Sequence, residues 1–155
     1  MSDPTPEQPL TRVVALIDGS HTAVRAAKKA AQVAKGLGLP LELITVAQPQ
    51  ADSARTDVAF FESTLPGAQS EEQKLARERQ APLTAAAAEL PADVALTFTV
   101  LEGRPKEVLF AALDARPGAL VFMGRTGLNA IQRVLKGSVA TALATYSSRP
   151  VVIVP

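Results

Sequence analysis

Short apolar stretches alternate along the chain with segments that have helical periodicity. Five of these stretches are expected to be buried strands, at residues 12–18, 41–47, 93–101, 119–123 and 150–154. Helices are expected between them, at residues 21–37, from about 70 to 90, from 105 to 116 and from about 136 to 146. Several strands are apolar throughout, which is typical of parallel strands with helices packed on both faces. The pattern therefore predicts an α/β fold with an open parallel sheet.

Capping residues support these helix boundaries. Ser20 is a good N-cap for the helix at 21–37, and Gly36 and Gly38 are expected to end it. Pro105 stands at the first position of its helix, where proline is tolerated. Pro82 lies inside the helix at 70–90, where it removes a backbone hydrogen bond, so a kink or a split is expected there.

Two segments fall outside this alternation. Residues 1–9 contain three prolines and few apolar residues, so we expect a disordered tail before a single domain at 10–155. Residues 48–70 are rich in proline, serine, threonine and glycine. Such a long segment without regular structure is typical of a lid, a packed excursion or disorder. The sequence leaves these three readings open.

Composition narrows the classes of function. The chain has 16 Lys and Arg against 15 Asp and Glu, and only 4% aromatic residues, which argues against a dedicated nucleic-acid binder. It contains no cysteine and one histidine, which excludes thiolate and multi-histidine metal sites and cysteine nucleophiles. The polar N-terminus lacks a signal pattern, and no apolar run is long enough to span a membrane. We therefore expect a cytoplasmic protein with no membrane partner.

A group of glycines follows the fourth predicted strand with a characteristic spacing. Gly124 ends the strand, Gly127 comes after two residues, and Gly137-Ser138 comes after nine more, at the start of a helix. Glycine allows backbone to approach a ligand closely, and free N–H groups at a helix start favour an anion. Each glycine alone could simply end a strand or cap a helix. The joint spacing favours a phosphate-binding backbone.

This G-x2-G-x9-G-S pattern resembles the nucleotide-binding signature of universal stress proteins, in the branch that binds ATP. All four positions match, and the resemblance covers residues 11–155, although 48–70 match only by position. It implies a three-layer, Rossmann-like sheet of order 3-2-1-4-5, with a ligand crevice between the first and fourth strands. It also places Val151–Val154 at the sheet edge, where we expect antiparallel pairing with a second copy in a homodimer.

The resemblance also implies nucleotide-binding residues. Those expected around the ribose and phosphates are Met123, Gly124, Arg125, Gly127, Gly137, Ser138 and Val139. Asp18 is expected near the adenosine half, and Val46 against the adenine. Other readings stay open: Val46 as plain core, Asp18 as a turn-forming residue and Arg125 as a solvated cation. No catalytic residue and no protein-held metal are expected.

The expected function is that of an ATP-binding, stress-response regulatory module, with Mg²⁺ held on the phosphates. A slow ATPase or phosphotransferase is a second reading, because phosphoryl transfer needs a base and a carboxylate for the metal beside the γ-phosphate. No Asp or Glu lies between Gly124 and Val139, and the resemblance places Asp18 at the other end of the nucleotide. A nucleotide-free interaction scaffold, with an unknown protein partner, is the third reading.

Overall fold

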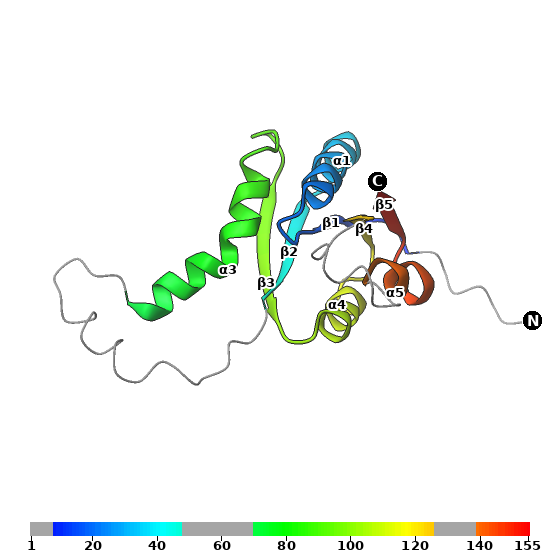
Figure 1. The fold of residues 1–155 in the computed structure, drawn as a ribbon. Coiled ribbons are helices and arrows are strands. Elements are labelled where there is room, and N and C mark those ends of the chain that lie inside the picture. The colour runs from blue at the N-terminus through cyan, green and yellow to red at the C-terminus, as the bar shows by residue number, and fades with distance from the viewer. Residues whose placement is uncertain (1–7, 48–69, 126–138) are drawn as a thin grey trace, which may run out of the picture.

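The computed structural model describes residues 8–47, 70–125 and 139–155. Its centre is a parallel five-stranded sheet of order β3-β2-β1-β4-β5 (Figure 1). The strands are β1 (Arg12–Leu16), β2 (Leu41–Ala47), β3 (Leu96–Glu102), β4 (Ala119–Gly124) and β5 (Val151–Val154). The predicted α/β class and the strand order 3-2-1-4-5 are confirmed.

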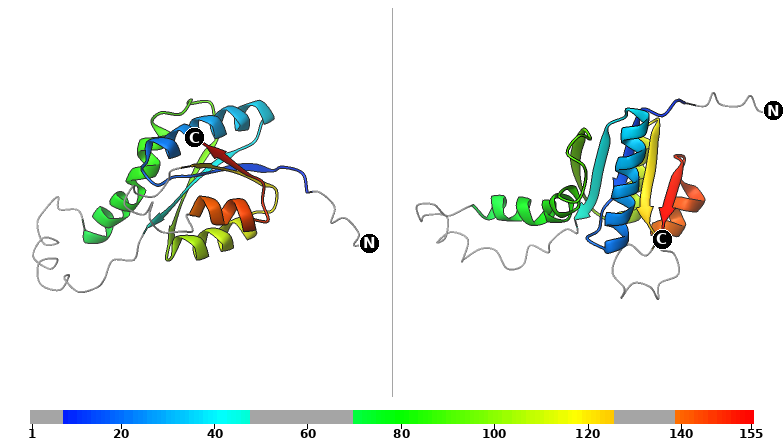
Figure 2. Two further views of the ribbon diagram at one scale, coloured as in Figure 1. Left: turned by 45° about the vertical axis from the view of Figure 1, so that its right-hand side comes forward. Right: turned by 90° about the horizontal axis from the view of Figure 1, so that it is seen from above.

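Helices pack on both faces of this sheet. They are α1 (His21–Leu37), α3 (Glu71–Ala87), α4 (Pro105–Asp114) and α5 (Val139–Tyr146). Figure 2 shows α1 and α3 on one face of the sheet and α4 and α5 on the other. The predicted three-layer arrangement is therefore confirmed. For the last helix, residues 136–138 lie outside the described part of the chain.

Side chains along each strand alternate between the two faces of the sheet, so the hydrophobic core has two parts. In β1, Val13 and Ala15 pack with α1 and α3, whereas Val14 and Leu16 pack with α4 and α5. Side chains of a strand point alternately to opposite faces, so an apolar run supplies both layers. This is why β1, at the centre of the sheet, contains no polar residue after Arg12.

The first helix has the termini that its sequence predicts. The Ser20 hydroxyl accepts a hydrogen bond from the Ala23 N–H at 3.2 Å, and Gly38 ends the helix at a φ of 67°. Its buried face consists of alanines, at positions 23, 26, 27, 30, 31 and 34. Small side chains allow the helix to lie close to the sheet, so its N-terminus reaches the end of β4.

The predicted start of the third strand differs from the structure, and of the two outcomes expected at Pro82, a kink or a split, the split does not occur. The third strand begins at Leu96, not at Asp93, because Asp93 lies in a turn where its carboxylate meets the Lys35 ammonium at 2.6 Å. Helix α3 is continuous through Pro82 and is not split there. Its ribbon changes direction along its length (Figure 1). Its two buried residues, Leu83 and Ala86, both follow the proline, so packing holds the second half against the sheet.

Several predictions fall on residues outside the described ranges. They concern the tail at residues 1–7, the segment 48–69, and the glycine motif from Gly127 to Ser138. Within residues 8–47, 70–125 and 139–155, no helix has the length and apolar character needed to cross a membrane.

Candidate functional site

A pocket opens at the carboxyl ends of β1, β2 and β4, where the strand order reverses. Its empty volume is about 480 Å³, including the part that is open to solvent. The described residues that line it are Leu16, Ile17, Asp18, Ala23, Ile44, Val46, Pro105, Leu109, Met123, Gly124 and Val139. This is the position at which open α/β sheets bind ligands.

The inner walls of the pocket are apolar. Ile44 and Met123 project from the sheet, and Leu109 comes from α4; all three are buried. Val46, at the carboxyl end of β2, packs against the same cluster and is only partly buried. The described walls therefore suit a ligand with an apolar face, because removal of apolar surface from water is favourable.

Asp18 supplies the carboxylate of the pocket. Its Oδ1 accepts a hydrogen bond from the Ser20 N–H at 2.9 Å, which fixes the turn from β1 into α1. Asp18 is half-buried and also lines the pocket. Asp18 therefore forms the turn that one interpretation of the sequence expected and also lines the pocket, and its contact with a nucleotide stays a prediction.

Gly124 is glycine for a reason that the sequence does not reveal. A Cβ at this position would lie 2.6 Å from the Thr22 Oγ1 and 2.7 Å from the Thr22 carbonyl carbon. The sequence reading assigned Gly124 to close approach of a ligand. In the structure it lines the pocket, and it also allows the N-terminus of α1 to touch the end of β4.

The predicted site residues divide into three groups. The structure brings Asp18, Val46, Met123, Gly124 and Val139 around one pocket, and their role in binding stays a prediction. Arg125 is exposed and is not among the residues that line the described pocket; its backbone N–H donates to the Val154 carbonyl at 2.8 Å. Gly127, Gly137 and Ser138 lie outside the described residues.

Sequence reasoning missed the contribution of α4. Pro105 and Leu109 form one wall of the pocket, because α4 begins directly after the carboxyl end of β3. The chain order contained a signal for this, since a helix that follows a parallel strand starts at the ligand edge of the sheet. Leu16 and Ile44, which lie in two of the predicted strands, also line the pocket and were not predicted as site residues.

The described part of the chain offers little for direct metal binding. Within it, no group of three or more His, Asp or Glu side chains could hold a metal ion. Asp18 is the acidic residue among those that line the described pocket.

The family is decided by sequence comparison over nearly the whole chain. The universal stress protein family model matches residues 9–155. The chain belongs to the universal stress protein family. A protein of Staphylococcus haemolyticus (strain JCSC1435) named among the universal stress proteins is 30% identical over 146 residues, covering 92% of this chain and 82% of the relative. The family that the glycine motif indicated is confirmed, whereas membership of the ATP-binding branch stays a prediction.

Solved universal stress proteins share the fold. One, in complex with cAMP, is 27% identical, with coverage of 94% of this chain and 97% of the other and a TM-score of 0.60. A universal stress protein from Lactobacillus plantarum is 22% identical, with coverage of 95% and 99% and a TM-score of 0.62. The second likeness shows the fold alone.

Proposed function

We propose that this universal stress protein is a stress-response regulatory protein that binds an adenine nucleotide, with ATP as the expected ligand. The observation that carries the proposal is the pocket at the switch point of the sheet, which joins apolar walls to the Asp18 carboxylate and the Gly124 backbone. The complex of a 27% identical relative with cAMP supports an adenine nucleotide as the class of ligand.

The described residues indicate how such a ligand would lie. In the proposed binding mode the base lies between Val46 and the apolar wall from α4 and β4, all of which line the pocket. Asp18 stands beside it at the end of β1, where its carboxylate can accept hydrogen bonds from ribose hydroxyls. The phosphates would then extend toward Gly137 and Ser138, the positions of the sequence motif, and would hold Mg²⁺.

A regulatory role fits the pocket better than rapid catalysis. Transfer of the γ-phosphoryl group needs a positioned base and a metal-binding carboxylate near that phosphate. The glycine motif from Gly124 to Val139 contains no acidic residue, and Asp18 lies on the adenosine side in this binding mode. We infer a cytoplasmic module whose state depends on bound nucleotide.

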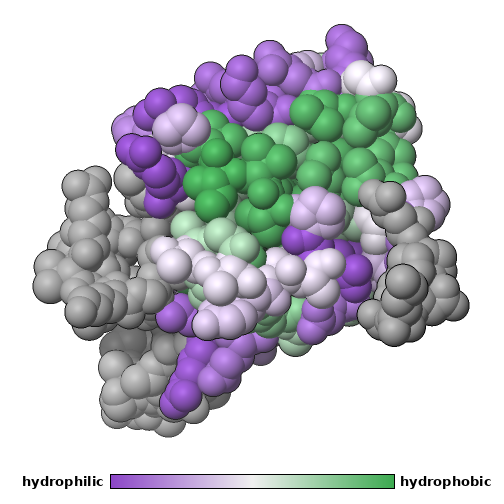
Figure 3. Space-filling view, turned by 90° about the vertical axis from the view of Figure 1, so that its right-hand side faces the viewer, coloured by the Kyte–Doolittle hydropathy of each residue, from purple (hydrophilic) through white to green (hydrophobic). Residues whose placement is uncertain are grey.

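The regulatory unit in this proposal is a homodimer formed through β5. This strand lies at the sheet edge, and its Val152 and Ile153 are 38% and 37% exposed. The side of the molecule on which β5 lies has a broad hydrophobic area (Figure 3). An edge strand with unpaired backbone groups and exposed apolar side chains is suited to antiparallel pairing with its copy.

Calorimetric titration with ATP, AMP, cAMP and GTP tests the proposed ligand. We expect binding of at least one adenine nucleotide and weaker binding of GTP. Val46→Phe fills the base site and should abolish binding, because Val46 lines the pocket and is partly open to it. Leu37→Phe is the matched control, since Leu37 is 53% exposed at the opposite end of α1. Absence of binding in the unmodified protein would overturn the proposal.

A further inference from the structure

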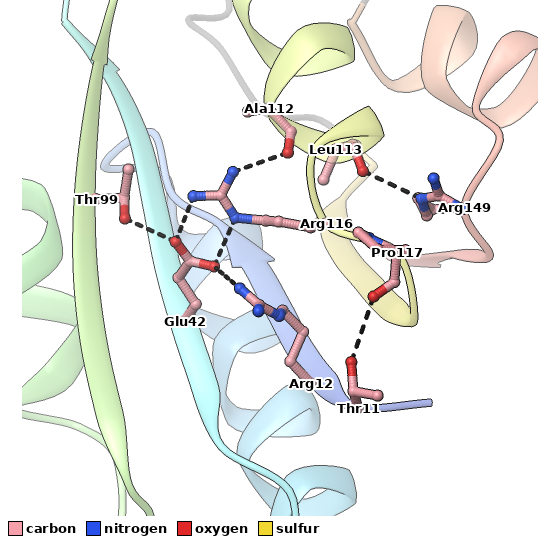
Figure 4. Close-up of polar contacts among 9 residues, drawn as sticks. All are labelled: Thr11, Arg12, Glu42, Thr99, Ala112, Leu113, Arg116, Pro117 and Arg149. Atoms are coloured by element: carbon pink, nitrogen blue, oxygen red, sulfur yellow. Dashed lines mark hydrogen bonds and ion pairs between the residues drawn. The ribbon is translucent and has the colours of Figure 1, made fainter. Parts of the chain in front are cut away.

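A buried carboxylate lies at the amino-end edge of the sheet, opposite the pocket. Glu42 is the second residue of β2, faces the α4 side and is only 8% exposed. The Thr99 hydroxyl donates to its Oε1 at 2.7 Å, and an Arg12 guanidinium nitrogen lies 3.6 Å from its Oε2 (Figure 4). A buried charge is costly unless it is paired and hydrogen-bonded, so these contacts need an explanation.

The strongest partner of Glu42 comes from the end of α4. Arg116 donates from Nε to Glu42 Oε2 and from Nη2 to Glu42 Oε1, each at 2.7 Å. Its remaining nitrogen, Nη1, donates to the Ala112 carbonyl in the last turn of α4 at 2.8 Å (Figure 4). One planar guanidinium thus joins β2 to the C-terminal turn of α4 through three short hydrogen bonds.

The charge on Glu42 is maintained within this cluster. Burial alone raises the pKa of the Glu42 carboxyl, but the hydrogen bonds from Arg116 and Thr99, together with the positive charges of Arg116 and Arg12, outweigh burial, and the pKa is lowered overall. The carboxylate is therefore ionised at neutral pH. A second arginine holds the same end of α4, since Arg149 Nε donates to the Leu113 carbonyl at 3.1 Å.

Helix α4 connects this cluster to the pocket. Its ten residues span about 15 Å, with Pro105 and Leu109 at the pocket and Ala112 and Leu113 at the cluster. Helix N-termini and C-termini both leave backbone groups without intrahelical partners. At its N-terminus, α4 has no side-chain cap, because Arg104 makes no capping hydrogen bond. The polar contacts at its C-terminal end, together with the buried Leu109 and Leu113, hold it against the sheet.

We propose that Glu42 is a positioning residue for the ligand pocket, acting through Arg116 and the rigid body of α4. The carboxylate fixes the C-terminal turn of the helix, and the helix in turn fixes Pro105 and Leu109 as one wall of the pocket. This role rests on the proposed nucleotide binding for its ligand. The geometry of the contact itself does not depend on that function.

The physical consequence is that a substitution of Glu42 changes the affinity for the ligand although Glu42 does not line the pocket. If the end of α4 is released, the helix samples positions in which its pocket wall is displaced. The apparent dissociation constant then rises in inverse proportion to the fraction of molecules that keep the competent pocket. Couplings of this kind change affinity by about 3- to 30-fold.

Glu42→Gln tests the proposal by replacing the carboxylate with a near-isosteric neutral group. We expect AMP, ATP or cAMP, whichever the unmodified protein binds, to bind about 3- to 30-fold more weakly by calorimetry. The titration is made at a temperature at which all variants are folded by circular dichroism. Arg116→Lys keeps the positive charge but loses the forked geometry, and it should weaken binding in the same direction if Glu42→Gln does not fold.

Two control variants separate positioning from general stability. Arg12→Gln removes a guanidinium that meets Glu42 from β1 and not from the end of α4, so affinity should stay within about twofold, below the coupling range. Leu83→Ala opens a cavity on the opposite face of the sheet, where Leu83 is fully buried in the α1 and α3 core. It should lower the melting temperature and leave the dissociation constant unchanged.

The outcomes distinguish this proposal from the proposed function. Unchanged affinity in Glu42→Gln and Arg116→Lys, with binding by the unmodified protein, would overturn the positioning role alone. So would an equal loss of affinity in Leu83→Ala. If the unmodified protein binds no nucleotide, the proposed function fails, and hydrogen exchange then decides the positioning role. Faster exchange at the Leu109 and Phe110 amides in Glu42→Gln supports it, and unchanged exchange there contradicts it.

Discussion

Replacing Gly124 by alanine should destabilise the protein even without ligand. The added Cβ would lie 2.6 Å from Thr22 Oγ1, 2.7 Å from the Thr22 carbonyl carbon and 2.8 Å from Thr22 Cβ. Two of these neighbours cannot rotate away, so α1 must shift from the end of β4. Overpacking of this kind costs about 1–3 kcal/mol of the free energy of unfolding. For a chain of this size the melting temperature should fall by roughly 2–12 °C.

Thermal unfolding followed by circular dichroism measures this effect. Gly36→Ala is the matched control, because Gly36 lies inside α1 and no described atom beyond the local helix backbone lies within 4 Å of the position that a Cβ would take. That substitution should raise the free energy of unfolding by about 0.5–1 kcal/mol through helix propensity. Thr22→Ala should restore little stability to Gly124→Ala, since the backbone carbon at 2.7 Å remains. A Gly124→Ala protein as stable as the unmodified one would refute the packing argument.

Two further predictions follow from the described contacts. Because the folded-state pKa of Glu42 is lowered, its stabilising effect is present above the unfolded-state value and is lost as pH falls through the folded-state value. Below about pH 4.5 the melting temperature should therefore fall more steeply for the unmodified protein than for Glu42→Gln; equal slopes would contradict this. Ile153→Lys places a charge on the exposed edge of β5 and should convert the proposed dimer to a monomer by light scattering. A monomeric unmodified protein at micromolar concentration would contradict the dimer.

The sequence predicted the strands well because each is a short apolar run. The resemblance to universal stress proteins implied that Asp18, Val46 and Met123 lie at the site, and the structure brings these three residues around one pocket. The start of β3 was placed too early because Asp93 and Val94 adjoin an apolar run, although they lie in a turn. Local pattern does not distinguish a strand from the turn that leads into it.

Contacts between distant segments could not be predicted in the same way. The pairing of Glu42 with Arg116 spans 74 positions of sequence, and nothing near either residue indicates a buried ion pair. The contact between Gly124 and Thr22 depends on how closely α1 approaches the sheet. Leu109 had the spacing of a core residue, and only the arrangement of α4 over the strand ends places it at the pocket.

A thermal-shift measurement with adenine nucleotides tests the central claim most directly. A ligand at 100 times its dissociation constant stabilises the native state by about 2.7 kcal/mol, which corresponds to roughly 5–10 °C here. The account predicts this rise for the unmodified protein with Mg-ATP, and for His21→Ala, whose side chain is exposed. Gly137→Val, in the predicted phosphate-binding motif, should show almost none. No shift in the unmodified protein with ATP, ADP, AMP or cAMP, and no nucleotide released on denaturation, would contradict it.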